Sequence, residues 1–200
     1  EHLVSLADVE DLHGIEGDGA DGSLSVGAMT TLREDEDHPK IQSQYLGFAT
    51  AVGLISSPLL RNMGTIGGNL LLDTRCSYYN QTEEWRDAID FCMKERGPIC
   101  WVAPSSPRCW AVQSSDAVPL LCAIGAEVSL LSVDGERRVT MDGLYHDDGI
   151  DYTSKRPDEL LTRVHLPKIG TWKSDYRKLR RRGSIDFPVL GVGACVDMDG

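Results

Sequence analysis

A segment with paired glycines, followed closely by four cysteines, constrains this chain more than any other feature. The segment Thr65-Ile66-Gly67-Gly68-Asn69 lies near the start of a stretch that ends at Asp116. Four of the six cysteines lie between these ends with the spacing C-x15-C-x7-C-x8-C: Cys76, Cys92, Cys100 and Cys109. We interpret the two ends of the stretch as parts of one site and the cysteine region as a loop inserted between them.

The paired glycines suit a phosphate-bearing ligand. Adjacent glycines let backbone N–H groups approach an anion without obstruction by a Cβ atom, and Thr65 and Asn69 can add side-chain donors. The segment therefore predicts a cradle for the diphosphate of a nucleotide cofactor. The spacing is not G-x-G-x-x-G, and a Gly-Gly pair is also typical of a plain tight turn, so the segment alone leaves both interpretations open.

The four clustered cysteines have three possible roles. Cationic side chains lie close to them in sequence, and four thiolates surrounded by cations and N–H donors suit an anionic iron–sulfur cluster. Zinc sites normally use cysteine pairs separated by two to four residues, which this spacing lacks. Two disulfides are expected if the chain is secreted, and the spacing alone does not decide between metal and disulfides. Cys122 and Cys195 lie in apolar runs and are expected in the core.

Composition excludes some partners. The chain has 200 residues, 41% of them hydrophobic, which suits one domain or two small lobes. Its formal net charge of -11 argues against a nucleic-acid or anionic-membrane surface, because both require a basic face. No apolar run approaches the length of a membrane-spanning helix, so we expect no membrane insertion. The first and last residues, 1–4 and 197–200, read as an interrupted strand and an unfinished hairpin turn, so we expect an internal fragment.

Hydrophobic periodicity predicts an α+β fold. We expect helices over 32–37, capped by Thr30 or Thr31, over 39–56 and over 117–126. Strands are expected over 24–28, 127–133, 137–141, 160–166, 176–181 and 189–198, with Asp134-Gly135 forming a hairpin turn. Helices mixed with hairpin-linked strands, without regular βαβ alternation, favour α+β over a doubly wound sheet.

A family resemblance emerges from several of these segments taken together. The run Arg61 to Asn69, continued by 72–76 and 78–81, closely resembles the FAD-binding subunit of molybdenum hydroxylases, the xanthine dehydrogenase and carbon monoxide dehydrogenase flavoprotein family. In most members the Gly-Gly-Asn segment runs almost directly into a segment similar to Ser114–Pro119. The residues between the two look like the insertion of the 4-hydroxybenzoyl-CoA reductase beta subunit, in which four cysteines bind a [4Fe-4S] cluster.

The resemblance implies a fold and a division of the chain. It implies a flavoprotein FAD-binding domain (PCMH-like), truncated at both ends, with a cysteine-bearing inserted loop. Residues 1–73 and 114–155 would form the FAD-binding lobe, 74–113 the iron–sulfur loop, and 156–200 the start of a truncated C-terminal lobe. A second glycine-rich loop of the family, which also grips the FAD diphosphate, would precede Glu1.

The resemblance also implies roles for individual residues. Thr65, Ile66, Gly67, Gly68 and Asn69 would bind the FAD diphosphate region, and Asp116 would contact the cofactor. Leu161 and Lys178 would line the flavin, although Leu161 could equally be a core residue and Lys178 a solvated strand charge. Cys76, Cys92, Cys100 and Cys109 would ligate the [4Fe-4S] cluster, and no residue would be catalytic.

The implied function is electron transfer within a cytoplasmic oxidoreductase complex. Its partners would be a molybdopterin-binding large subunit, a small subunit with [2Fe-2S] clusters, and an external carrier such as ferredoxin, NAD or a quinone. The complex would dehydroxylate an aromatic acyl-CoA, as 4-hydroxybenzoyl-CoA reductase does, or work as a xanthine- or aldehyde-type hydroxylase. Two alternatives remain: a non-redox module stabilised by zinc or disulfides, and a stand-alone flavin oxidase.

Overall fold

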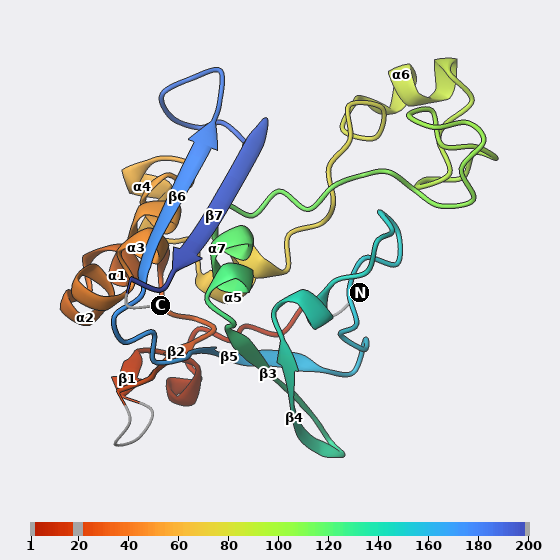
Figure 1. Cartoon of the computed structure of the whole chain (residues 1–200). Helices are drawn as coiled ribbons and strands as arrows, with labels where there is room; N and C mark the ends of the chain where they lie inside the picture. Colours follow the sequence, from red (N-terminus) through yellow and green to blue (C-terminus); the bar gives the residue numbers. More distant parts are fainter. Residues whose placement is uncertain (1–2, 18–21, 199–200) are drawn as a thin grey trace. The chain divides into compact units, whose positions relative to one another are not determined.

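The computed structural model describes residues 3–17 and 22–198, which form two compact units (Figure 1). The first unit comprises Glu1–Leu71, Ser115–Leu144 and Lys155–Gly200. The second comprises Leu72–Ser114 and Tyr145–Ser154. The four clustered cysteines all belong to the second unit, so each unit is described by itself.

An antiparallel sheet of five strands, in the order β1-β2-β5-β3-β4, forms one layer of the first unit. Its strands are β1 (Ile15–Gly17), β2 (Leu24–Gly27), β3 (Glu127–Ser132), β4 (Gly135–Thr140) and β5 (Leu160–Leu166). The central strand β5 pairs with β2 and β3, and Val164 and Leu166 on it are fully buried. The β3–β4 hairpin turns at Asp134-Gly135, as the sequence predicts, and Gly135 has a positive φ of 119°.

Short helices surround a core that includes Tyr45, Phe48, Ile66 and Leu120. The helices of the first unit are α1 (Leu32–Asp37), α2 (Pro39–Gln44), α3 (Leu46–Gly53), α4 (Pro58–Arg61), α5 (Ile66–Leu70) and α7 (Ala117–Ala123), with 3-10 turns at Glu10–Leu12 and Asp142–Leu144. Of the two expected caps, Thr31 begins α1, and it does so through a complete capping box with Glu34.

A separate two-stranded sheet packs against these helices. It consists of β6 (Lys173–Leu179) and β7 (Leu190–Val196), which pair antiparallel. β6 lies against α3 and β7 lies against α7 (Figure 1). The contact with α7 needs glycine, because a Cβ atom on Gly193 would lie 2.5 Å from the backbone nitrogen of Leu120.

The second unit contains little regular structure. Its helix is α6 (Glu83–Ala88), which Thr82 caps. Isolated bridges join Arg75 to Val112 and Tyr145 to Thr153. Most of this unit therefore depends on side-chain contacts rather than on helix or sheet hydrogen bonds.

The α+β class is confirmed, but two predictions are wrong. The expected helix over 39–56 is two helices, because Tyr45 leaves helical geometry at φ −124°, ψ 48° and its hydroxyl donates to the carbonyl oxygen of Pro167 at 2.9 Å. Cys122 is exposed and Cys195 half-buried, so neither is a core residue. Cys122 falls on the outward side of α7, whereas Cys195 shares with Gly193 a face of β7 that is only partly covered. The expected terminal strand and turn fall partly on residues 1–2 and 199–200, outside the described residues. Within the described residues no helix combines the length and apolarity needed to cross a membrane.

Candidate functional site

The paired glycines lie in the first turn of α5, with Thr65 as the N-cap. The N–H of Gly67 donates to the carbonyl oxygen of Ala28 at 2.9 Å, and the N–H of Gly68 donates to Oγ1 of Thr65 at 3.2 Å. Both groups thus already have acceptors inside the protein. The predicted cradle of free backbone N–H groups is therefore not what the structure presents.

What the glycines provide instead is close approach. A Cβ atom on Gly67 would lie 2.8 Å from the Cβ and the carbonyl oxygen of Ala28, so only glycine lets α5 sit against this residue. Gly68 is exposed, and its missing Cβ leaves the backbone uncovered beside the Thr65 hydroxyl. Since that hydroxyl oxygen accepts from Gly68, its own hydrogen can donate to a ligand oxygen.

A hydrogen bond joins the glycine segment to the end of the cysteine-bearing stretch. Asn69 is buried in α5, and its Oδ1 accepts a hydrogen bond from the Ser115 hydroxyl. The same Ser115 oxygen accepts from the N–H of Ala117 at 3.2 Å, which fixes the start of α7. Residues 46 positions apart in sequence thus meet, as the interpretation of two ends forming one site requires.

Asp116, next to Ser115, is held by two side chains of β6. It accepts a hydrogen bond from the Tyr176 hydroxyl at 2.7 Å and forms an ion pair with Nζ of Lys178 at 2.8 Å. Burial raises the pKa of Asp116, and the bonds from Lys178 and Tyr176 oppose that rise. Burial, together with the Asp116 carboxylate, also raises the pKa of Tyr176, which therefore stays a hydrogen-bond donor.

Both residues expected to line the flavin are buried. The Lys178 side chain is 1% exposed and also donates to the carbonyl oxygen of Leu54 at 3.1 Å, which rules out the solvated-charge interpretation. Leu161 lies in β5, one residue before Thr162, whose carbonyl oxygen accepts from the N–H of Ala28 at 2.9 Å. Through Ala28, β5 is therefore connected to Gly67. The structure brings the glycine segment, Asp116, Lys178 and β5 into one region of the first unit.

Sequence reasoning missed three residues of this region. Tyr176 lies two positions before Lys178 on the same face of β6, and the period of a strand could have revealed it. Gly191 leaves room for it, because a Cβ atom there would collide with the Tyr176 hydroxyl. Ser115 was visible only as part of the Ser114–Pro119 segment, and nothing in its spacing indicated the bond to Asn69.

In the second unit, three of the four clustered cysteines are buried: Cys92, Cys100 and Cys109. Burial alone would raise the pKa of the Cys100 thiol, but N–H groups of Ala103, Trp110 and Val102 and the Arg108 guanidinium lower it overall. Burial raises the pKa of Cys109, and the neighbouring thiols of Cys100 and Cys92 add to the rise. The thiols of Cys100 and Cys92 therefore each lie within electrostatic range of Cys109.

Backbone hydrogen bonds of the adjacent residue place Cys76 near the other clustered cysteines. Arg75 and Val112 exchange two hydrogen bonds, of 2.9 and 3.0 Å, and this antiparallel register places Cys76 opposite Ala111. The N–H of Ala111 in turn approaches Sγ of Cys109 at 3.4 Å. All six cysteines are free, and among the described residues no three His, Cys, Asp or Glu side chains are arranged to hold a metal ion.

Two cations support this cysteine region. Nζ of Lys94 is nearly buried and bonds Asp73 at 2.7 Å, the Thr74 hydroxyl at 2.9 Å and the Gly149 carbonyl oxygen at 2.8 Å. Arg108 stacks on Trp110 at 4.3 Å from the ring centroid and pairs with Asp147 at 2.9 Å. These contacts fix positive charge near the thiols, a chemistry that suits sulfur-ligated anions.

Comparison with known proteins agrees with this geometry. The family model described as the FAD binding domain in molybdopterin dehydrogenase matches residues 1–169. The chain is 29% identical over 192 residues to the aldehyde oxidoreductase FAD-binding subunit PaoB of Escherichia coli, covering 90% of this chain and 59% of that protein. It is also 29% identical over 206 residues to the carbon monoxide dehydrogenase medium chain of Afipia carboxidovorans, covering 100% of this chain and 55% of that protein.

A solved structure of a Cu,Mo-CO dehydrogenase in its cyanide-inactivated form superposes with a TM-score of 0.72 at 26% identity. This match covers 100% of the chain and 55% of the solved one, so the chain spans little more than half the length of these relatives. Because the family model covers far more than half of its residues, the chain belongs to the family of FAD-binding domains of molybdopterin dehydrogenases.

Proposed function

We propose that this chain is the FAD- and iron–sulfur-containing part of an electron-transfer subunit in a molybdenum-dependent oxidoreductase complex. The main support for FAD binding is that the hydrogen bond between Asn69 and Ser115 brings the Thr65–Asn69 segment close to Asp116 and its partner Lys178. Bound FAD would supply two-electron chemistry and exchange single electrons with iron–sulfur centres.

The residues of the first unit divide the work of holding FAD. The Thr65 hydroxyl donates to a diphosphate oxygen, and the uncovered backbone at Gly68 lets that diphosphate come close. Behind this part of α5 lie three buried residues that support it from the core: Ile66, Gly67 and Asn69. For Asp116, Lys178 and Leu161 to touch the cofactor, their buried region must open toward it. While this region stays closed, the ion pair between Asp116 and Lys178 holds the start of α7 in place.

Thr65 offers a direct test of FAD binding, with Thr31 as its matched control. Both threonines cap a short helix, so replacing either by valine costs about 1 kcal/mol of stability. We expect Thr65→Val to lower the FAD content of the full-length protein and raise its Kd at least tenfold, whereas Thr31→Val leaves FAD binding unchanged. Equal loss of FAD in both variants would show that the effect is only one of stability and would contradict the proposed role.

The cluster half of the proposal is supported by the second unit itself. This unit has roughly fifty residues and one short helix, and a unit of that size rarely buries enough apolar surface to fold without a metal or disulfides. It has free thiols from Cys92 and Cys100, each within electrostatic range of Cys109, and the Arg75–Val112 bridge brings Cys76 toward Cys109. A [4Fe-4S] cluster ligated by these four cysteines would link the segments of the unit and stabilise its fold.

Iron analysis distinguishes a cluster from the zinc or disulfide alternatives. We expect anaerobically purified full-length protein to contain iron and acid-labile sulfide in equal amounts and to give an EPR signal when reduced. Cys100→Ser should remove that signal while FAD stays bound. The control Cys122→Ser replaces an exposed thiol of the first unit and should change neither. Zinc in place of iron, or no metal at all, would refute the cluster without touching the flavin proposal.

The complex around the subunit is also part of the proposal. We infer a molybdopterin-binding large subunit, a [2Fe-2S] small subunit and an external carrier: ferredoxin, NAD or a quinone. The resemblance of the cysteine-bearing insertion to that of the 4-hydroxybenzoyl-CoA reductase beta subunit favours an aromatic acyl-CoA dehydroxylation, while the names of the relatives favour an aldehyde- or carbon monoxide-type oxidation. Co-purification with molybdenum, followed by assays in both directions, separates these from each other and from a stand-alone flavin oxidase.

A further inference from the structure

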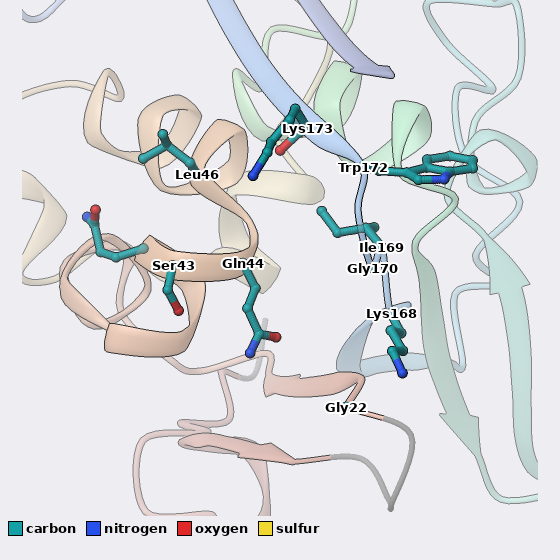
Figure 2. Close-up of a pocket in the computed structure, with 11 residues that line it drawn as sticks. Gly22, Ser43, Gln44, Leu46, Lys168, Ile169, Gly170, Trp172 and Lys173 are labelled. Atoms are coloured by element: carbon teal, nitrogen blue, oxygen red, sulfur yellow. The ribbon is translucent and has the colours of Figure 1, made fainter. Parts of the chain in front are cut away.

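A cavity of about 490 Å³ lies in the first unit, where α2 meets α3 and the chain passes from β5 to β6 (Figure 2). The residues that matter for its chemistry are Gln44, Leu46, Lys168, Ile169, Trp172 and Lys173. Its volume falls within the range of roughly 300–1,000 Å³ that is typical of small-molecule sites. Nothing in the proposed flavin or cluster chemistry uses these residues.

The charge of the cavity is opposite to that of the chain. Lys168 and Lys173 both line it, and within residues 3–17 and 22–198 neither side chain forms an ion pair or hydrogen bond. Among the described residues that line the cavity, none is acidic. Since the whole chain carries a formal charge of -11, two unpaired ammonium groups in one cavity provide a local site for anions.

The two ammonium groups point to different parts of the cavity. Figure 2 shows the Lys173 side chain directed toward α3 beside Leu46, whereas Lys168 extends in the direction of Gly22. The amide of Gln44 extends into the same lower part as Lys168 and makes no hydrogen bond with the described part of the chain. Between these polar groups, the Ile169 side chain points into the cavity and offers apolar surface, whereas the Trp172 ring extends to the other side of the chain (Figure 2).

This cavity is separate from the candidate flavin site. Both sites use β6, but the cavity lies at its first residue, Lys173, and the Asp116 pair lies at Lys178. Five residues of a strand span about 16 Å, so one small ligand cannot occupy both places.

We propose that this cavity binds a small organic dianion whose two negative groups are separated by a short apolar spacer. One group binds the Lys173 ammonium, and the other binds the Lys168 ammonium and the Gln44 amide. The spacer lies against Ile169. Ammonium groups act as point charges with three donors each, so carboxylate and phosphate groups are both suitable.

Calorimetric titration of the full-length protein with dicarboxylates of increasing length tests this proposal. Malonate, succinate and glutarate are the probes, with acetate as the monoanion and phosphorylated glycolate as the mixed phosphate and carboxylate. We expect saturable binding of at least one dianion that depends on spacer length, and at least tenfold weaker binding of acetate. Lys168→Gln and Lys173→Gln should each raise the Kd at least fivefold.

The control variant is Lys40→Gln, an exposed lysine outside the cavity, which should leave the Kd unchanged. FAD content should stay constant in all three variants, so failure here is distinguishable from failure of the flavin proposal. Binding that is independent of spacer length, or equally weakened by Lys40→Gln, would reduce the effect to net charge and overturn the proposal. So would binding by the isolated subunit that disappears in the assembled complex, which would assign the cavity to an acidic segment of a partner.

Discussion

Asp35 is a buried acidic residue whose carboxylate should destabilise the fold. It lies fully buried in α1, and neither of its carboxylate oxygens has a hydrogen-bond partner. Burial, aided by the charge of Glu34, raises its pKa well above the usual value. We expect Asp35→Leu to raise the free energy of unfolding at neutral pH by about 1–3 kcal/mol, the cost of an unsatisfied buried polar group.

The pH dependence of that gain has a definite sign. Because the folded-state pKa of Asp35 is raised, the unfolded state releases its proton first, and stability falls as pH rises above the unfolded value of about 4. Denaturant titrations from pH 4 to 8 should therefore show the gain of Asp35→Leu growing with pH. A constant difference across this range would mean that Asp35 finds a partner.

The ionised Glu159 side chain should stabilise the fold, and this stabilisation should be lost at low pH. Hydrogen bonds from the Arg137 guanidinium lower the pKa of Glu159 to about 2, with the N–H and guanidinium of Arg156 adding to the shift. Stability from this carboxylate is complete above the unfolded pKa of about 4.3 and is lost as pH falls toward 2. Glu159→Gln should flatten the acid side of the stability profile between these values. An unchanged acid limb in urea titrations would exclude this pair as its source.

At the scale of elements, the sequence predicted those features that depend only on residues close together along the chain. A helix cap at Thr30 or Thr31, the Asp134-Gly135 turn and strand β5 follow from residues within a few positions. All three are confirmed, with Thr31 as the cap. The break at Tyr45 does not, because it comes from a bond to Pro167, 122 residues away. Similarly, the Gly-Gly segment was recognisable as a motif, but its occupied N–H groups depend on Ala28, which sequence spacing could not show.

The contact between β7 and α7 provides a test at this scale. A Cβ atom on Gly193 would lie 2.5 Å from the Leu120 nitrogen and 2.6 Å from its Cα, so both elements would have to move apart. We expect Gly193→Ala to lower the free energy of unfolding by about 1–3 kcal/mol, as overpacking does. Gly183→Ala is the control, since a Cβ atom there would meet nothing within 4 Å and its φ lies outside the left-handed region. Equal thermal midpoints for the two variants would contradict the close packing of β7 on α7.

At the scale of the molecule, the sequence indicated the four cysteines but not the unit to which they belong. The inserted loop was placed at residues 74–113, whereas the compact unit also takes in Tyr145–Ser154. Hydrogen bonds from Thr74 and Lys94 to the Gly149 carbonyl oxygen hold the two segments together. Such a pairing of distant segments has no periodic or spacing signature, so only the three-dimensional structure reveals it.

If an iron–sulfur cluster stabilises the second unit, removal of the iron should destabilise that unit before the first. The second unit has few backbone hydrogen bonds in regular structure, so without ligated thiols its amides should exchange quickly with solvent. We expect hydrogen exchange of residues 72–114 to rise at least tenfold after anaerobic chelation, while β3 and β5 of the first unit keep their protection because their hydrogen bonds form a buried ladder. Cys100→Ser should reproduce the effect without chelator, and Cys122→Ser should not. A uniform rise over both units would place the stabilising role of the metal elsewhere.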